Sequence, residues 1–163
     1  MKDVELRLIS ELVKNSRRSD RELAKTLGIS QPTVSRTRVR LEKQGLIDYS
    51  AVPDLAELGF EIISVTLGKR DYQKQPEINI QKAKDFVKRY PNIIFTASGR
   101  GLNNDRIVIS IHRDYSDYSK IMQEMKTEWA GRADVNSFLI SLSGDVVQPL
   151  SLKRFAEHLK KEG

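Results

Sequence analysis

A glycine and a serine two residues apart, Gly28 and Ser30, most constrain what this chain can fold into. Gly28 stands where a left-handed residue ends a helix, and Ser30 is an N-cap that begins the next one. Upstream, Ser19 and Glu22 form a capping box, in which each side chain accepts a hydrogen bond from a backbone amide. The sequence therefore predicts two helices joined by a tight turn, at about residues 20–27 and 31–44.

A third helix is predicted in front of this pair. Apolar residues recur there at helical spacing, as Val4, Leu8, Ile9, Leu12 and Val13. This pattern indicates an amphipathic helix over residues 3–15, which would support the two that follow. A supported pair with a tight turn is a helix-turn-helix, the unit that places its second helix in the major groove of double-stranded DNA.

The second helix of the pair carries hydrogen-bond donors and positive charge, and no acidic residue lies between Ser30 and Leu41. Val34 and Leu41, seven residues apart, are expected to face the core. Arginine contacts guanine bidentately, and serine or threonine reaches bases or phosphates. We therefore predict DNA contacts by the residues in and around its outer stripe: Ser30, Gln31, Thr33, Ser35, Arg36, Thr37 and Arg40.

Arg38 and Val39 do not fit this orientation of the helix. On an ideal helical wheel, Arg38 lies near the buried side and Val39 lies opposite to it. Two explanations remain open. Either the helix is rotated from the assigned orientation, or the Arg38 side chain extends along the edge of the core and keeps its guanidinium near water.

Charge and composition agree with a polyanionic partner. The first 50 residues hold 11 of the chain's 28 lysine and arginine residues and 7 of its 22 aspartate and glutamate residues, a net charge of +4 out of +6. No apolar run approaches a transmembrane length, and the first residues lack the apolar stretch of a secretory signal. The chain also has no cysteine, so we expect a protein of the cytoplasm whose mature chain starts here.

The next residues predict a wing and a linker. After Gly45, residues 46–52 alternate in polarity and are expected to form a strand beside the DNA-reading helix. Residues 54–58 are expected to form one helical turn that ends at Gly59. These boundaries give a winged helix-turn-helix domain at residues 1–52, a linker at residues 53–59 and a second domain at residues 60–163.

The second domain follows the pattern strand, helix, strand, strand, helix, strand. The expected strands are residues 60–69, 92–98, 106–113 and 134–143. Apolar residues mark the two helices: Ile80, Ala83, Phe86, Val87 and Tyr90 in the first, and Tyr118, Ile121, Met122, Met125 and Trp129 in the second. This order is that of the α+β ferredoxin-like βαββαβ fold, an antiparallel sheet with both helices on one face.

The strands are apolar on both sides, although this fold leaves one face of its sheet without helices. Neighbouring pairs such as Ile62 with Ile63 and Ile107 with Val108 show the pattern. The open face is expected to be covered by a second copy of the chain, which gives a homodimer or a larger homo-oligomer. The alternative is that a C-terminal helix folds over this face, through Leu150, Leu152, Phe155, Ala156 and Leu159.

Over nearly its whole length the chain resembles the leucine-responsive regulator (Lrp/AsnC) family, most specifically in the stretches LGISQPTVSR, residues 27–36, and RLEKQGLI, residues 40–47. The resemblance implies a DNA-binding transcription regulator that assembles into dimers or larger oligomers. It also implies that the C-terminal domain binds a small effector, often an amino acid.

In that family a glycine followed closely by an aspartate, in the turn between the second and third strands, lies near the effector. The corresponding stretch here is longer, and the implied effector-binding residues are Gly99, Arg100, Gly101 and Asp105. Asp105 would hold the ammonium group of an amino acid, and Arg100 its carboxylate. The same residue types are ordinary in a β-hairpin turn, so a purely structural role is the alternative.

Some proteins that resemble this family are sirohaem decarboxylases, which leaves an enzymatic alternative. The intact basic helix favours a regulator instead. His112 and His158 are far apart in sequence and form no ligand motif, and we expect the first at a strand end and the second on a solvent-facing helix. The sequence contains no nucleophile motif, so we expect no catalytic residue, no bound metal and no cofactor.

Overall fold

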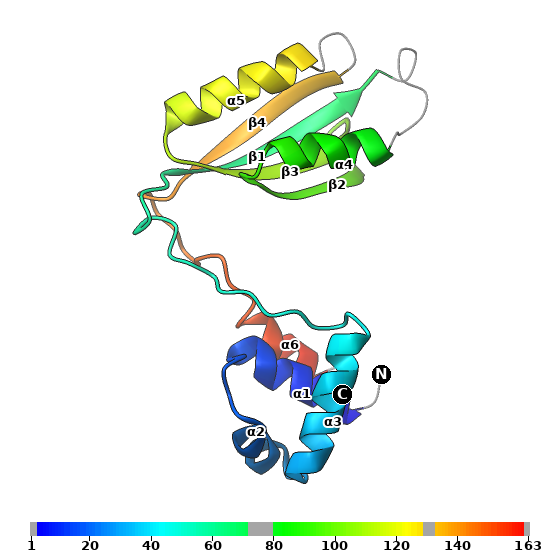
Figure 1. Cartoon of the computed structure of the whole chain (residues 1–163). Coiled ribbons are helices and arrows are strands. Elements are labelled where there is room, and N and C mark those ends of the chain that lie inside the picture. Colours follow the sequence, from blue (N-terminus) through cyan, green and yellow to red (C-terminus); the bar gives the residue numbers. More distant parts are fainter. Residues whose placement is uncertain (1–2, 72–79, 129–132, 162–163) are drawn as a thin grey trace. The chain divides into compact units, whose positions relative to one another are not determined.

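The computed structural model describes residues 3–71, 80–128 and 133–161, and the chain in it divides into two compact units (Figure 1). We call Met1–Val52 together with Gln148–Gly163 the head unit, and Pro53–Val147 the sheet unit. Among the described residues, no helix is long and apolar enough to cross a membrane.

The head unit is built from four helices around one apolar core. They are α1 (Asp3–Lys14), α2 (Asp20–Leu27), α3 (Gln31–Lys43) and α6 (Phe155–Lys161). The first three follow the predicted boundaries closely, because the caps and the apolar spacing both specify them. Their buried apolar residues form a single cluster: Leu8, Leu12, Leu23, Ala24, Leu27, Val34 and Leu41.

The position of α6 corrects the sequence-based domain boundary, which assigned the whole C-terminal segment to the second domain. In the structure this helix packs on α1. The Ser10 hydroxyl donates a hydrogen bond of 2.7 Å to the backbone carbonyl of Ala156, and both residues are fully buried. The small alanine lets the two helices approach closely, which places α6 in the head unit.

The predicted wing is also corrected. Residues 47–54 contain no strand, because the described part of the head unit holds no strand that could pair with them and a strand needs a ladder partner. The helical turn before Gly59 is confirmed, since the Leu58 amide donates to the Asp54 carbonyl at 3.2 Å and Gly59 has a φ of 78°.

Arg38 fixes the orientation of α3 against the residues that follow α1. Its Nη1 donates to the Asp20 carboxylate at 3.1 Å and to the Arg18 carbonyl at 3.3 Å, and its Nη2 donates to the Ser16 carbonyl at 3.2 Å. Its Nε donates to the Tyr49 hydroxyl at 2.9 Å. The guanidinium thus extends along the edge of the core, the second of the two explanations that the sequence left open.

The sheet unit has the predicted ferredoxin-like order. Its elements are β1 (Ile62–Arg70), α4 (Ile80–Arg89), β2 (Ile93–Gly101), β3 (Asn104–His112), α5 (Tyr115–Glu128) and β4 (Ala133–Ser141). The four strands are antiparallel in the order β2-β3-β1-β4. Residues of α4 and α5 share one apolar cluster against a single face of the sheet. Trp129, expected on the second helix, lies outside the described residues.

The face under the helices is polar at its centre. Ser64, Thr66, Ser110 and His112 are all buried there. Their polar atoms pair with one another, since the Thr66 hydroxyl lies 3.0 Å from that of Ser64 and the Ser110 hydroxyl lies 2.8 Å from His112 Nε2. A buried polar group costs little when it is hydrogen-bonded, so this face tolerates hydroxyls beneath the helices.

The opposite face, which we call the open face, is apolar across all four strands. Strand alternation and the observed register place these side chains together: Ile63, Val65, Leu67, Phe95, Ile107, Ile109, Ile111, Phe138 and Ile140. Phe138 keeps 71% of its surface exposed. The prediction of strands that are apolar on both sides is thus only partly right, because the face under the helices mixes apolar with hydroxyl side chains.

Replacing Arg38 with alanine is expected to destabilise the chain by about 1 to 3 kcal/mol, since it leaves a carboxylate and two carbonyls without their donor. Arg38→Lys should recover only part of this loss, because an ammonium lacks the planar fork of a guanidinium. Urea denaturation measures both. The exposed Arg36→Ala is the matched control and should change stability by less than about 0.5 kcal/mol. Equal unfolding midpoints for Arg38→Ala and Arg36→Ala would contradict the role given to Arg38.

His112 should make the stability of the chain depend on pH. Burial lowers the pKa of His112, although the Asp117 carboxylate 3.6 Å from its Nδ1 acts in the opposite direction. The unfolded chain therefore takes up the proton first, at a pH near the ordinary value of about 6.5. Stability should be constant above that pH and should fall below it, by at most about 1.4 kcal/mol per pH unit.

Denaturation midpoints at pH 8 and pH 5.5 measure this effect. The decrease in stability from pH 8 to pH 5.5 should be smaller in His112→Gln than in the unmodified chain. In His158→Gln, which alters an exposed histidine, the decrease should be unchanged. An identical pH dependence in all three proteins would be inconsistent with a buried, neutral His112.

Candidate nucleic-acid interface

The turn between α2 and α3 has the geometry that its sequence predicts. Gly28 adopts a φ of 69°, and its amide donates to the Ala24 carbonyl at the end of α2. At the start of α2, the Ser19 amide donates to the Glu22 carboxylate at 2.8 Å and the Glu22 amide donates back to the Ser19 hydroxyl at 3.3 Å. The hydrogen bonds from Ser19 lower the pKa of Glu22, so the capping box is made by an ionised carboxylate.

The buried side of α3 includes one of the residues predicted to contact DNA. Thr37 lies with Val34 and Leu41 against the core and is only 8% exposed. Its assignment to the outer stripe is therefore wrong. The core side of α3 is wider than the two apolar residues indicated, because Thr37 flanks Val34 and Leu41 on one side and the anchored Arg38 flanks them on the other.

Two predicted contact residues form the cap of α3. The Ser30 hydroxyl accepts a hydrogen bond from the Thr33 amide at 3.3 Å and lies 2.8 Å from the Thr33 hydroxyl. Ser30 is exposed and Thr33 is half-buried. Both therefore lie at the N-terminal end of α3, the part of a recognition helix that approaches base edges.

Four exposed or half-exposed residues form the rest of the outer face: Gln31, Ser35, Arg36 and Val39. The Arg36 Nε donates to the Pro32 carbonyl at 3.3 Å, so this side chain follows the helix toward its N-terminus. Arg40 lies at the edge of the face and forms an ion pair with Glu5 of α1. Of the two arginines named as DNA contacts, only Arg36 thus lies within the outer face.

Residues that the sequence analysis did not assign complete this surface. Lys43 is exposed one turn beyond Val39, and Arg21 and Lys25 are exposed on α2. The signal was available in the sequence, because Arg21 and Lys25 lie four residues apart on the side of α2 opposite its apolar residues. In a helix-turn-helix the first helix of the pair crosses the DNA backbone, where lysine and arginine neutralise phosphates.

The whole net charge of the chain belongs to the head unit. Divided at the unit boundaries, the head unit holds 15 of the 28 basic and 9 of the 22 acidic residues, a net charge of +6, whereas the sheet unit holds 13 of each. The sequence had placed only +4 before residue 51. The remaining +2 comes from the C-terminal segment, which the structure joins to the head.

The four predicted effector residues lie at the hairpin between β2 and β3, and its turn is shorter than expected. β2 continues to Gly101, which pairs with Asn104, so the turn consists of Leu102 and Asn103, with φ values of 50° and 59°. These are the angles of a two-residue type I′ turn. The additional residues of this stretch lengthen β2 and not the turn. Gly99, Arg100 and Gly101 are exposed at the end of β2, and Asp105 is half-buried in β3.

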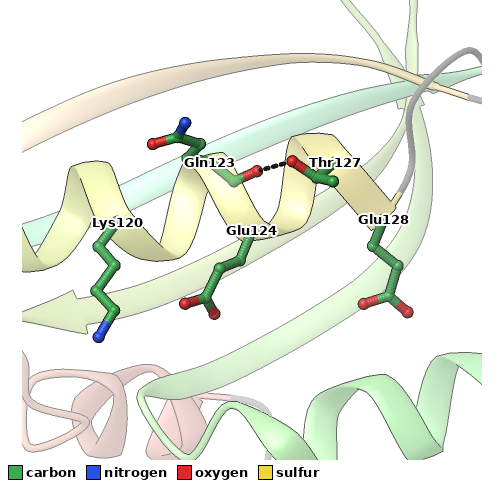
Figure 2. Close-up of a pocket in the computed structure, with 5 residues that line it drawn as sticks. All are labelled: Lys120, Gln123, Glu124, Thr127 and Glu128. Atoms are coloured by element: carbon green, nitrogen blue, oxygen red, sulfur yellow. Dashed lines mark hydrogen bonds between the residues drawn. The ribbon is translucent and has the colours of Figure 1, made fainter.

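A separate hollow of about 460 Å³ lies along α5 (Figure 2). Its lining residues all come from that helix: Lys120, Gln123, Glu124, Thr127 and Glu128. In Figure 2 the Thr127 hydroxyl donates to the Gln123 carbonyl, at 2.8 Å, so it serves the helix and not a ligand. None of the predicted effector residues lines this hollow.

Comparison with known proteins agrees with this geometry. A family model described as the AsnC-type helix-turn-helix domain matches residues 1–42. The HTH-type transcriptional regulator LrpC of Bacillus subtilis is 32% identical over 96 residues, which cover 56% of this chain and 61% of LrpC. The HTH-type transcriptional regulator Ptr1 of Methanocaldococcus jannaschii is 28% identical over 122 residues, which cover 74% of this chain and 78% of Ptr1.

A solved structure extends the likeness to the complete fold. The transcriptional regulator NMB0573 of Neisseria meningitidis, in a complex with L-Met, matches with a TM-score of 0.76 at 14% identity, over 95% of this chain and 99% of that one. The two curated relatives are regulators by name, and the range that the family model matches contains α1, α2 and most of α3. Residues 1–42 therefore match the AsnC-type helix-turn-helix domain, and the chain as a whole is similar to the Lrp/AsnC transcription regulators.

Proposed function

We propose that this chain regulates transcription in the cytoplasm by binding specific duplex DNA as a dimer or larger assembly, with α3 in the major groove. One observation carries the proposal: the exposed face of α3 is basic and, apart from Val39, polar. Its orientation is fixed by Arg38, and the unit that contains it holds the entire net positive charge. Backbone attraction and base readout both require these properties.

The contacts divide into two classes. Gln31, Ser35 and Arg36 on the outer face of α3 are proposed to reach base edges, with Ser30 and Thr33 at its N-terminal end. Arg21 and Lys25 of α2 are proposed to contact phosphates. Arg40 belongs to the second class, because its ion pair with Glu5 holds it at the rim of the surface.

A second copy of the chain is proposed to cover the open face of the sheet. Apolar side chains line all four strands there, and Ile94, Phe95 and Phe138 are exposed in the single chain. Contiguous apolar surface of this kind indicates an interface, and a two-fold dimer presents two reading heads to a palindromic site.

The hairpin between β2 and β3 is proposed to bind a small effector such as an amino acid, through Gly99, Arg100, Gly101 and Asp105. Arg100 is exposed and able to pair with a carboxylate. Asp105 lies two residues before Ile107 in β3 and therefore on the same, open face of the sheet. The related NMB0573 structure contains L-Met. Such a ligand would act by binding one assembly state more tightly than the other.

Arg36→Ala is expected to weaken binding to a site selected from random duplex DNA by about 1 to 3 kcal/mol and to relax base preference at one position. Fluorescence anisotropy at fixed salt measures the dissociation constant. Lys88→Ala, which removes an exposed charge from the sheet unit, is the matched control and should leave affinity unchanged. Equal affinities for the Arg36→Ala variant and the unmodified chain would refute the placement of α3 in the groove.

Phe138→Glu is expected to convert a dimer into a monomer, because it places a charge on the apolar face that the dimer would bury. Light scattering gives the mass, and circular dichroism confirms that the variant is folded. Tyr115→Glu changes an equally large exposed side chain at the start of α5 and should remain dimeric. If the unmodified chain is a monomer at micromolar concentration, the open face is not an interface between copies.

A thermal-shift series over the amino acids tests the effector proposal. A ligand at about 100 times its dissociation constant should add roughly 2.7 kcal/mol of stability, and Arg100→Ala should abolish that gain. Lys120→Ala serves as the comparison, since Lys120 lines the hollow on α5. A gain lost in Lys120→Ala but retained in Arg100→Ala would place the ligand on α5. No gain with any amino acid would leave the hairpin a structural element.

A further inference from the structure

Val39 is an apolar side chain in the middle of the DNA-facing surface. It lies on α3 and is 43% exposed. Across the described residues of α1, α2 and α3, it is the one large apolar side chain that is exposed. Its burial would contribute nothing to the head core, which lies on the opposite side of the helix at Val34 and Leu41.

The neighbours of Val39 leave it facing outward without an acidic side chain beside it. Ser35 and Arg36 lie one turn before it and Lys43 one turn after it. Glu42 is the nearby acid, but its carboxylate accepts a hydrogen bond from the Tyr49 hydroxyl at 2.9 Å and lies 3.4 Å from the Arg38 Nε. This pairing draws the Glu42 carboxylate toward Arg38. The charged side chains left beside Val39 are therefore the cations Arg36 and Lys43, which attract a DNA phosphate.

Resting on the proposed function, we infer that Val39 contacts the C5-methyl group of a thymine in the major groove and thereby selects an A·T pair at one position of each half-site. Arg36 and Lys43 attract the DNA phosphates, and this attraction favours insertion of α3 into the major groove. Among the base edges exposed there, thymine alone presents an apolar group. Over any other base, the valine would cover polar atoms and give them no hydrogen-bond partner.

The conformation of Val39 is also restricted before any contact with DNA forms. A β-branched side chain in a helix has one strongly preferred rotamer, so it loses little freedom when a base approaches. The helix beneath it is held by the Arg38 contacts, and the methyl-to-methyl contact requires no desolvation of charge. Burial of one methyl group corresponds to about a fourfold change in affinity, or about 0.8 kcal/mol.

Uracil in place of thymine removes only the methyl group and keeps every hydrogen-bonding atom, so it isolates the contact. The full chain is titrated with its selected duplex, in which each dT of one half-site is replaced in turn by dU, at fixed salt. One replacement is expected to weaken binding about fourfold. In Val39→Ala the same replacement should change affinity by a factor close to 1, because the partner of the methyl group is gone.

Val52→Ala is the matched control, since it shortens an exposed valine of the head unit outside α3 and should keep the fourfold effect. Alanine favours helices, so Val39→Ala preserves the fold of α3. The inference is overturned if no dT replacement weakens binding, if the half-site contains no A·T pair, or if the fourfold loss persists in Val39→Ala. A chain that binds selected and scrambled duplexes equally overturns the proposed function itself, and the inference with it.

Discussion

The guanidinium of Arg38 is the contact on which the DNA-facing surface depends. It donates to groups at three places in the sequence: the turn after α1, the first residue of α2, and Tyr49 beyond α3. Because these donors form a planar fork, they fix the rotation of α3 about its own axis as well as its position. The side chains that face outward on α3 follow from that rotation.

The sheet unit distributes its polar and apolar residues in an unusual way. Hydroxyl groups and a histidine lie beneath the helices, where each is paired, and the continuous apolar surface lies on the side without helices. The unit therefore leaves on its open face apolar area that it does not bury by itself. Because apolar burial drives most protein association, this arrangement makes assembly a source of stability and not only a means of presenting two heads.

Local chemistry made most of the secondary structure predictable. Caps at Ser19 and Ser30 and the left-handed Gly28 set the helix boundaries of the head, and strand alternation identified the ferredoxin-like order. The sequence-based assignment of Thr37 was wrong for a different reason than distance in the chain. Thr37 was grouped with the outer stripe by its spacing, although on an ideal wheel it lies only about 60° from Val34, at the buried edge of that stripe.

Two further errors arose from contacts that are remote in sequence. Ser10 and Ala156 meet across most of the chain, and no local pattern reports a partner at that distance. In the hairpin, a glycine-rich stretch looked like a long turn. Gly99 and Gly101 do not adopt positive φ angles, and Leu102 and Asn103 supply them in their place.

Because α6 belongs to the head unit, the ribosome completes the head unit only after it has made the whole sheet unit. The face of α1 around Ser10 is made first, while its partner helix leaves the ribosome only after the complete sheet unit. A nascent chain therefore exposes that face of α1 until the 146 residues that separate Ser10 from Ala156 have been made. At about 5 to 20 residues per second this takes roughly 7 to 30 seconds. The sheet unit is able to form before the head is closed, so the part of the chain proposed to pair with another copy is ready before the part that binds the genome is complete.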